Sequence, residues 1–439
     1  MRKMLGTPLR AVVVTLSAAA ALVLVGGALG RSSGRSETTP PQLTEQTTAV
    51  DRLEQTIGRA QERLRRVPGD WQTWAALGMA YLERSRITTD PTYYPKAEEA
   101  VRRSLVLKPQ ENADALVARG ALANARHDFA AGRRDALAAI RANAFHAEAY
   151  AVLADAETQL GNAGAATAAV QRTLDLRPGL SAYARASYDL EQRGRTDEAA
   201  DLMRRALAAA VDRHDIAFCR VQLGDLAFNA GDLSTAEREY AAGLDADPSS
   251  VALQRGRARV AWAKGNMDEA LAGYAAITDR APTPAYLLEY AELLRAAGRD
   301  GEAGSQLRLA TAAHQLFAGN GGIDGLTGAA LADAAGQPAQ ALREARAEWS
   351  RRRHADVADT LGWALHRSNQ DAQALGYARR AHATGARSAR YAYHLAMVEL
   401  ALGDRAAARV HLEQALRLNP YFSVVDAPVA RRTLAGLEE

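Results

Sequence analysis

The sequence predicts an all-α protein built as a solenoid of paired helices. Of its 439 residues 48% are apolar but only 6% are aromatic, so the core is expected to rest on alanine. An alanine core needs close backbone approach, which favours stacked helices over a sheet. A sequence pattern of Gly, Ala, a larger apolar residue and Pro, at constant spacing, also recurs along the chain. Such a pattern is typical of helical repeats.

The first element is a run of twenty uncharged residues at 11–30. It follows three basic residues, Arg2, Lys3 and Arg10. Twenty helical residues span the core of a bilayer, and the basic flank favours a cytoplasmic N-terminus. We therefore expect 1–30 to form a basic tip and a transmembrane signal anchor, with the rest of the chain exported. A cleaved signal peptide is the alternative, because Ala28 and Gly30 are small enough for a cleavage site.

The remainder divides into a linker, a solenoid and two caps. Residues 31–50 are rich in Ser, Thr and Pro and predict a flexible linker. A capping helix is expected within 51–70 and a C-terminal cap within 423–439, because the end units of a solenoid must cover their apolar faces. The solenoid itself is predicted at 71–422. Its Gly-rich stretch at 318–328 is expected to be a joint that divides seven units from three.

Four positions define the repeat. Its closing prolines are Pro178, Pro248, Pro282 and Pro420, each with Ala twelve residues earlier, a larger apolar residue eight earlier and Gly seventeen earlier. The Gly permits the positive-φ turn that ends one helix, and the Ala lets the second helix pack close to the first. The Pro suits the start of the next unit. Each unit is therefore predicted to be two antiparallel helices of about a dozen residues.

This pattern resembles the tetratricopeptide repeat, whose signature is W-x2-L-G-x2-Y followed by Ala, a large residue, Ala and Pro. The first unit carries Trp74, Leu77, Gly78, Tyr81, Ala97, Val101 and Pro109. It has about seven extra residues, including Tyr93 and Tyr94, which predict either a contact loop or a plain longer turn. The resemblance implies a right-handed superhelical solenoid. Ten units are placed at 71–110, 113–146, 147–180, 180–213, 217–250, 251–283, 284–317, 322–354, 355–388 and 389–422.

Motifs for catalysis and for ligand binding are missing from the sequence. It contains no phosphate-binding loop, no dinucleotide fingerprint and no H-E-x-x-H, and its nine His lie at least twelve residues apart. Its one cysteine, Cys219, excludes an intramolecular disulfide and a multi-thiolate metal site, and a buried structural thiol is favoured over a nucleophile. A net charge of +3 argues against nucleic-acid binding. We therefore predict that the protein is not an enzyme and that it has no catalytic residue, cofactor or metal.

In the family that the chain resembles, the first helix of each unit lines the inner, concave groove. The inner positions with aromatic or charged side chains are Tyr188, Phe218, Asp225, Phe228, Arg255, Arg259, Trp262, Glu292, Arg295, Trp363, Arg390 and Tyr393. Arg255, Arg259 and Trp262 share one helical face. We hypothesise that they grip an extended or acidic segment of a partner. The alternative is that the aromatics pack against a neighbouring helix and the arginines are solvated.

These observations predict a protein-interaction scaffold or assembly factor at the outer face of a bacterial cytoplasmic membrane. The amino-acid composition is rich in Ala and Arg and includes only four Lys, which is typical of a bacterium with a high-GC genome. One alternative is a cleaved, secreted protein that binds peptide or glycan, and another is an enzyme with an unrecognised site. The partner is predicted to be an envelope protein, with the membrane contacted through the N-terminal helix. The sequence specifies no oligomeric state.

Overall fold

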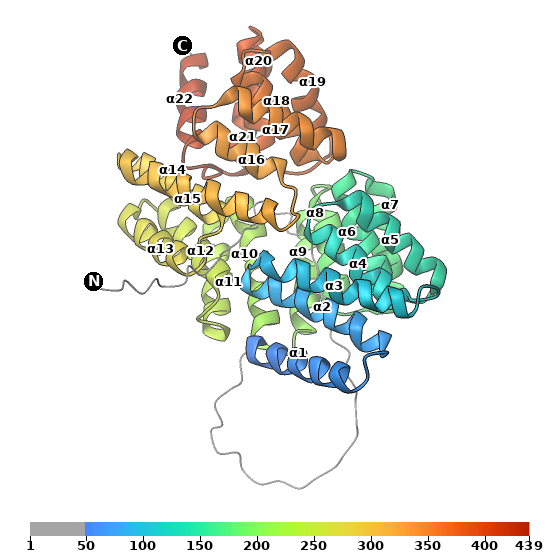
Figure 1. The fold of residues 1–439 in the computed structure, drawn as a ribbon. Coiled ribbons are helices and arrows are strands. Elements are labelled where there is room, and N and C mark those ends of the chain that lie inside the picture. The colour runs from blue at the N-terminus through green and yellow to red at the C-terminus, as the bar shows by residue number, and fades with distance from the viewer. Residues whose placement is uncertain (1–48, 439) are drawn as a thin grey trace, which may run out of the picture.

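The computed structural model describes residues 49–438, and these residues form α-helices, one 3-10 helix and short connections with no strand (Figure 1). The helices of the first half are α1 (Ala49–Arg66), α2 (Trp71–Thr88), η1 (Pro91–Tyr93), α3 (Tyr94–Leu107), α4 (Ala113–Ala125), α5 (Phe129–Ala142), α6 (Ala147–Leu160), α7 (Ala163–Leu176), α8 (Leu180–Glu191), α9 (Thr196–Ala208), α10 (Arg213–Asn229) and α11 (Leu233–Ala246). Those of the second half are α12 (Val251–Ala263), α13 (Met267–Arg280), α14 (Pro284–Ala296), α15 (Asp300–Gly319), α16 (Gly325–Ala334), α17 (Pro338–Arg351), α18 (Ala355–Arg367), α19 (Asp371–His382), α20 (Ala389–Ala401), α21 (Arg405–Leu418) and α22 (Asp426–Glu438).

The helices α2 to α21 form ten consecutive antiparallel hairpins. Local residues explain how each hairpin turns. In the fifth, Gly231 adopts φ 77° after α10, and the Asp232 side chain caps α11 by accepting the Thr235 amide at 3.0 Å. At the two ends of the stack, α1 packs on the first hairpin and α22 packs on the tenth. The predicted all-α, right-handed solenoid of about ten helix–turn–helix repeats is confirmed.

Small residues let the helices approach closely. Ala136, Ala236 and Ala270 are fully buried at positions where second helices meet first helices. A Cβ on Gly224 or on Gly256 would lie less than 3.0 Å from the same aromatic ring, that of Tyr240. The larger residue of one hairpin therefore fills the space that two glycines leave.

The extra residues of the first hairpin form a structural turn rather than a free loop. They lengthen α2 to 18 residues and add η1. The Tyr94 hydroxyl donates to the Ala125 carbonyl at 3.3 Å, and its ring packs edge-on against Phe317 at 6.3 Å between centroids. The Tyr93 ring lies 6.2 Å from that of Tyr81.

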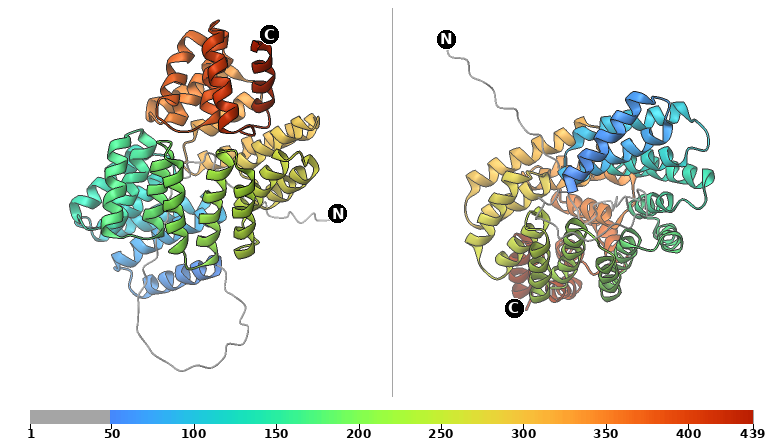
Figure 2. Two further views of the ribbon diagram at one scale, coloured as in Figure 1. Left: turned by 180° about the vertical axis from the view of Figure 1, so that it is seen from behind. Right: turned by 90° about the horizontal axis from the view of Figure 1, so that it is seen from below.

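The solenoid makes one superhelical turn and begins a second that stacks on the first (Figures 1 and 2). We call α1–α15 the first turn and α16–α22 the second turn. Connections between hairpins of the second turn lie on the turns within hairpins of the first. The Ile323 amide donates to the Arg126 carbonyl at 2.9 Å, and the Asn419 side-chain amide donates to the Phe228 carbonyl at 2.9 Å, across 191 residues.

Several sequence predictions fall outside the described residues. The predicted anchor at 11–30 and nearly all of the linker at 31–50 belong to them. Within 49–438, the structure contains no helix with the length and apolarity needed to cross a bilayer. The segment predicted as a joint, 318–328, contains the end of α15, a connection at 320–324 and the start of α16.

Candidate binding site on the inner face

The inner face of the first turn carries a ladder of ion pairs between first helices of successive hairpins. Arg255 on α12 holds Glu289 on α14 through two hydrogen bonds, Nε–Oε2 at 2.7 Å and Nη2–Oε1 at 2.5 Å. Arg259, one helical turn further along α12, donates from Nη1 to Asp225 Oδ1 on α10 at 3.0 Å. Each pair joins residues 34 positions apart, which is one repeat. The ladder therefore ties three consecutive hairpins together.

At each end of the ladder, one tyrosine from a second helix donates a hydrogen bond to the carboxylate. The Tyr240 hydroxyl donates to Asp225 at 2.6 Å, and the Tyr274 hydroxyl donates to Glu289 at 2.8 Å. Burial opposes ionisation of Glu289, but the charge and hydrogen bonds of Arg255 outweigh it and lower the pKa of this carboxyl. The four charged side chains of this network stay about one-fifth to one-quarter exposed, so solvent reaches them, whereas the two tyrosines are buried.

The pairing bears on the hypothesis that Arg255 and Arg259 grip an acidic segment. Both guanidinium groups already bind internal carboxylates, and Arg259 also lies 4.0 Å from the Phe228 ring centroid. An acidic ligand would have to displace these carboxylates and leave them unpaired, which costs more than a new pair returns. The Arg-rich face is therefore a neutralised one.

Two of the six predicted aromatic residues, Phe228 and Tyr393, are buried, and the other four are half-buried. Phe228 is only 1% exposed. Phe218 packs against the cluster that contains Met203, and Trp262 packs against the cluster between the sixth and seventh hairpins. The alternative of aromatic packing thus applies fully to Phe228 and partly to the half-buried Phe218 and Trp262. Tyr188 is half-buried, and it lies near Asp356 of the second turn.

The second turn carries three of the predicted residues, Trp363, Arg390 and Tyr393. Tyr393 is 2% exposed and belongs to the core. The Trp363 ring stacks on His394 at 4.1 Å, while its Nε1 donates to Asp333 at 3.1 Å. Arg390 repeats the one-repeat ladder, because its Nη2 lies 2.7 Å from Asp356 Oδ1, 34 residues earlier.

Two carboxylates on the inner face have no counter-ion. Glu191 at the end of α8 and Glu292 on α14 are half-buried, and neither makes an ion pair or hydrogen bond among the described residues. Burial raises the pKa of Glu191 to about 7, with Asp225 and Asp356 adding to the effect. Burial raises the pKa of Glu292 to about 8, and Asp426 is its strongest acidic neighbour.

The predicted Arg295 does not compensate Glu292. Its Nη1 donates instead to the Ala334 carbonyl at 2.7 Å, at the end of α16. The two unpaired groups described on this face are therefore carboxyls with raised pKa values.

The lone thiol lies inside the solenoid. Cys219 is fully buried, as favoured from the sequence, and burial raises the pKa of its thiol to about 12. No group of three or more potential metal ligands gathers anywhere in 49–438.

Comparison with known proteins identifies the family of one hairpin. The family model described as "Tetratricopeptide repeat" matches residues 389–422, which are the tenth hairpin. That hairpin pairs its two helices in the same antiparallel way as the nine before it. The tenth hairpin is a tetratricopeptide repeat. The sequence matches no curated protein.

Solved structures of other repeat proteins resemble this one at low identity. The Cut9–Hcn1 hetero-tetramer of the APC/C shows 15% identity and a TM-score of 0.38, over 90% of this chain and 97% of that one. Yeast Tom70 shows 14% identity and a TM-score of 0.37, over 89% and 87% of the two chains. A tetratricopeptide-repeat protein from Parabacteroides merdae shows 15% identity and a TM-score of 0.35, over 59% and 99%. Likeness at this level says nothing about what this chain binds.

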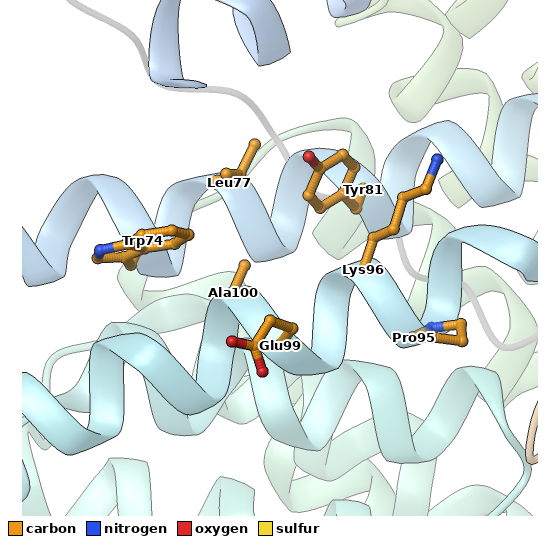
Figure 3. Close-up of a pocket in the computed structure, with 7 residues that line it drawn as sticks. All are labelled: Trp74, Leu77, Tyr81, Pro95, Lys96, Glu99 and Ala100. Carbon is orange, nitrogen blue, oxygen red and sulfur yellow. The ribbon is translucent and has the colours of Figure 1, made fainter. Parts of the chain in front are cut away.

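A cavity of about 360 Å³ lies on the first hairpin, outside the inner face (Figure 3). Signature side chains Trp74 and Tyr81 of α2 line one side, and Lys96 and Glu99 of α3 line the other. These signature positions would pack against a preceding repeat, and α1 supplies only one helix there. The cavity therefore exists because the stack of hairpins begins here and no complete hairpin precedes the first one.

Sequence reasoning missed Glu289, Tyr240 and Tyr274 as parts of the inner-face network. A signal for Glu289 was present, because it stands 34 residues after Arg255 and so occupies the same place in the next repeat. The tyrosines occupy the large apolar position of the repeat, which predicts burial and does not reveal a hydroxyl that reaches the inner face.

Proposed function

We propose that this protein is a non-enzymatic scaffold that binds an extended segment of a partner protein on its inner face. In this proposal, residues 11–30 hold the chain in the cytoplasmic membrane of a bacterium with the repeats on the outer side. A mature protein that begins near Arg31 would instead indicate the secreted alternative, and intact mass measurement separates the two.

The observation that carries the binding proposal is the pair of uncompensated carboxylates, Glu191 and Glu292, on a face that is otherwise internally neutralised. A half-buried carboxylate without a counter-ion is unfavourable, and a cationic side chain that approaches it forms a charge-assisted hydrogen bond. The partner segment is therefore expected to present Lys or Arg side chains. The surrounding ladder of Arg255, Arg259 and their partners holds the surface in one shape, so little ordering is needed on binding.

The test is retention of a partner from detergent-solubilised membranes by the intact protein. A variant with Glu191→Gln and Glu292→Gln keeps the shape of both side chains and removes their charge. The control is Glu302→Gln, which removes a carboxylate from the exposed surface of α15, where it pairs with Arg299.

We expect one protein band that the intact chain and the control retain and the double variant loses. The same band with all three proteins would place the contact elsewhere, and the cavity beside Trp74 would be examined next. No retained protein from any of the three would refute the scaffold function. Circular dichroism and the melting temperature show that each variant remains folded.

A further inference from the structure

Apolar side chains make up most of the lining of the cavity on the first hairpin (Figure 3). They are the rings of Trp74, Tyr81 and Pro95 and the side chains of Leu77 and Ala100. Leu77 and Ala100 are 3% and 2% exposed, whereas the two aromatic residues are half-buried and Pro95 is exposed. Solvent therefore reaches these rings, and an apolar occupant would remove them from water, which is favourable.

The polar atoms of the two aromatic side chains already have partners. The Trp74 Nε1 donates to the Pro68 carbonyl at 2.9 Å, and the Gln61 side-chain amide donates to the Tyr81 hydroxyl at 2.8 Å. An occupant can therefore use only the faces of these rings, by apolar contact. Aromatic-lined grooves of this kind bind proline-containing segments in the polyproline II conformation.

The sequence supplies such a segment shortly before the described residues. Within 31–48 the only large apolar residue is Leu43, and it closely follows the adjacent prolines Pro40 and Pro41. All other residues of this stretch are polar or Gly. Two prolines and a leucine match the apolar chemistry of the cavity, and proline loses little conformational entropy on binding because its φ angle is already fixed.

The start of α1 lies on the Lys96 side of the cavity. Glu54, in the second turn of α1, forms an ion pair with Arg84 at 2.8 Å. The Arg84 guanidinium lies 5.8 Å from the centroid of the Tyr93 ring, and the Lys96 ammonium lies 4.4 Å from the same centroid. Leu43 stands six positions before the start of α1. Six residues span up to about 20 Å when extended, which is enough to reach the cavity.

We propose that residues 40–43 of this same chain occupy the cavity, with Leu43 and the two prolines against the rings of Trp74 and Tyr81. The short tether favours this occupant over a separate molecule, because a short link gives an effective concentration in the millimolar range. The docked segment covers the exposed end of the stack, where a complete preceding hairpin would otherwise pack.

Docking also fixes how far the solenoid stands from its anchor, which goes beyond the proposed function. With residues 40–43 held on the first hairpin, ten positions separate Gly30 from Pro40. They reach about 35 Å at most, so the first hairpin stays close to the bilayer in an anchored chain. The docking itself is the same in a chain that begins near Arg31, so it does not depend on which form is mature.

Disulfide formation between two introduced cysteines measures the docking in the full-length protein in detergent. Gln42→Cys places a thiol beside Leu43, and Lys96→Cys places one on the exposed surface of α3 at the cavity. The native Cys219 is fully buried, so it does not compete for the introduced thiols. The rate of disulfide formation in one redox buffer then reports how often residue 42 lies at the cavity.

The matched control pairs Gln42→Cys with Glu98→Cys. Glu98 is exposed on the same helix, two positions after Lys96, but its side chain binds Arg126 of the second hairpin at 2.8 Å and does not line the cavity. We expect the 42–96 pair to oxidise at least about tenfold faster than the 42–98 pair. Equal rates would show that residues 40–43 have no preference for the cavity and would overturn the proposal.

A second comparison tests the apolar contact itself. In the 42–96 protein, Leu43→Ser with Pro40→Ser and Pro41→Ser removes the side chains that enter the cavity and keeps the length of the tether. We expect oxidation to slow about tenfold, to the rate of the control pair. An unchanged rate would show that the tether alone brings the thiols together, and the docking would be refuted. Circular dichroism shows that each variant remains folded.

The same cysteine variants identify a different occupant. Slow oxidation of the 42–96 pair, together with cross-linking of the thiol at position 96 to a retained membrane partner, would assign the cavity to that partner and overturn the docking of residues 40–43. The scaffold function concerns the inner face and has its own test in Glu191 and Glu292, so failure of the docking leaves it standing.

Discussion

Replacement of Glu292 by Gln should make the protein more stable at alkaline pH. The side chain is half-buried on α14, faces Asp426, Glu289 and Asp333, and has no ion-pair partner within the described residues. These surroundings raise the pKa of the carboxyl from 4.5 to about 8. Glutamine has nearly the same shape but no charge, so it removes the cost of ionisation in the folded state.

The sign and the pH range follow from proton linkage. Below pH 4.5 the carboxyl is neutral in both folded and unfolded states and does not affect their difference. Between pH 4.5 and about 8 the folded state keeps a proton that the unfolded state releases, so stability falls as pH rises. At roughly 1.4 kcal/mol per pH unit the full loss above pH 8 is at most about 5 kcal/mol. Solvent access to the side chain reduces this, and about 2–3 kcal/mol is expected.

The assay is urea unfolding of the wild type and of Glu292→Gln at pH 5.0, 6.5 and 8.5. The difference between the two proteins should be close to zero at pH 5.0 and should grow in favour of the variant at each higher pH. The control Glu289→Gln should be destabilised at pH 6.5 and 8.5, because it breaks the pair with Arg255. A Glu292→Gln variant that is less stable than the wild type at pH 8.5 would refute the reasoning.

Three further outcomes are expected. Gly256→Ala should destabilise the protein by about 1–3 kcal/mol, because its Cβ overlaps the buried Tyr240 ring. Gly376→Ala should stabilise it by about 0.5–1 kcal/mol, because this exposed helical site has open space around it. Thermal melting of the two variants and the wild type measures both effects. Asn419→Ala should cost about 1–3 kcal/mol, because the buried Phe228 carbonyl loses its donor, and hydrogen exchange near Arg353 should rise with it. Cys219, whose pKa burial raises to about 12, should not react with a thiol reagent at pH 8 until the chain is unfolded in urea.

The repeat and the core were predictable because both depend on local spacing. Ala236 and Tyr240 lie in one helix four residues apart, and their spacing from Pro248 recurs in other units. Such positions pack against neighbours within the same or the next hairpin, so the contacts they make are encoded within about 34 residues. For this reason the sequence predicted the helical hairpins, the superhelical class and the buried thiol.

The binding face was predicted only in part. Asp225, Arg255 and Arg259 were predicted as groove residues, but their mutual pairing was not foreseen. Whether an arginine is free or neutralised depends on which residue of the neighbouring repeat lies opposite, and pairing at one-repeat separation was not considered. The prediction of an acidic partner did not take this pairing into account.

The sequence alone determined a stack of helical hairpins, the likeness of the chain to tetratricopeptide repeats, and the residue types that face inward. Only the tertiary structure decided that the second turn lies on the first, with Gly161 against Arg353 and Asp356 near Glu191. Each hairpin rotates slightly relative to its neighbour, and these small rotations add up over about 190 residues before the two turns meet. No local pattern records that sum, so the contact between the turns and the charge of the surface it covers emerge only when the whole stack is assembled.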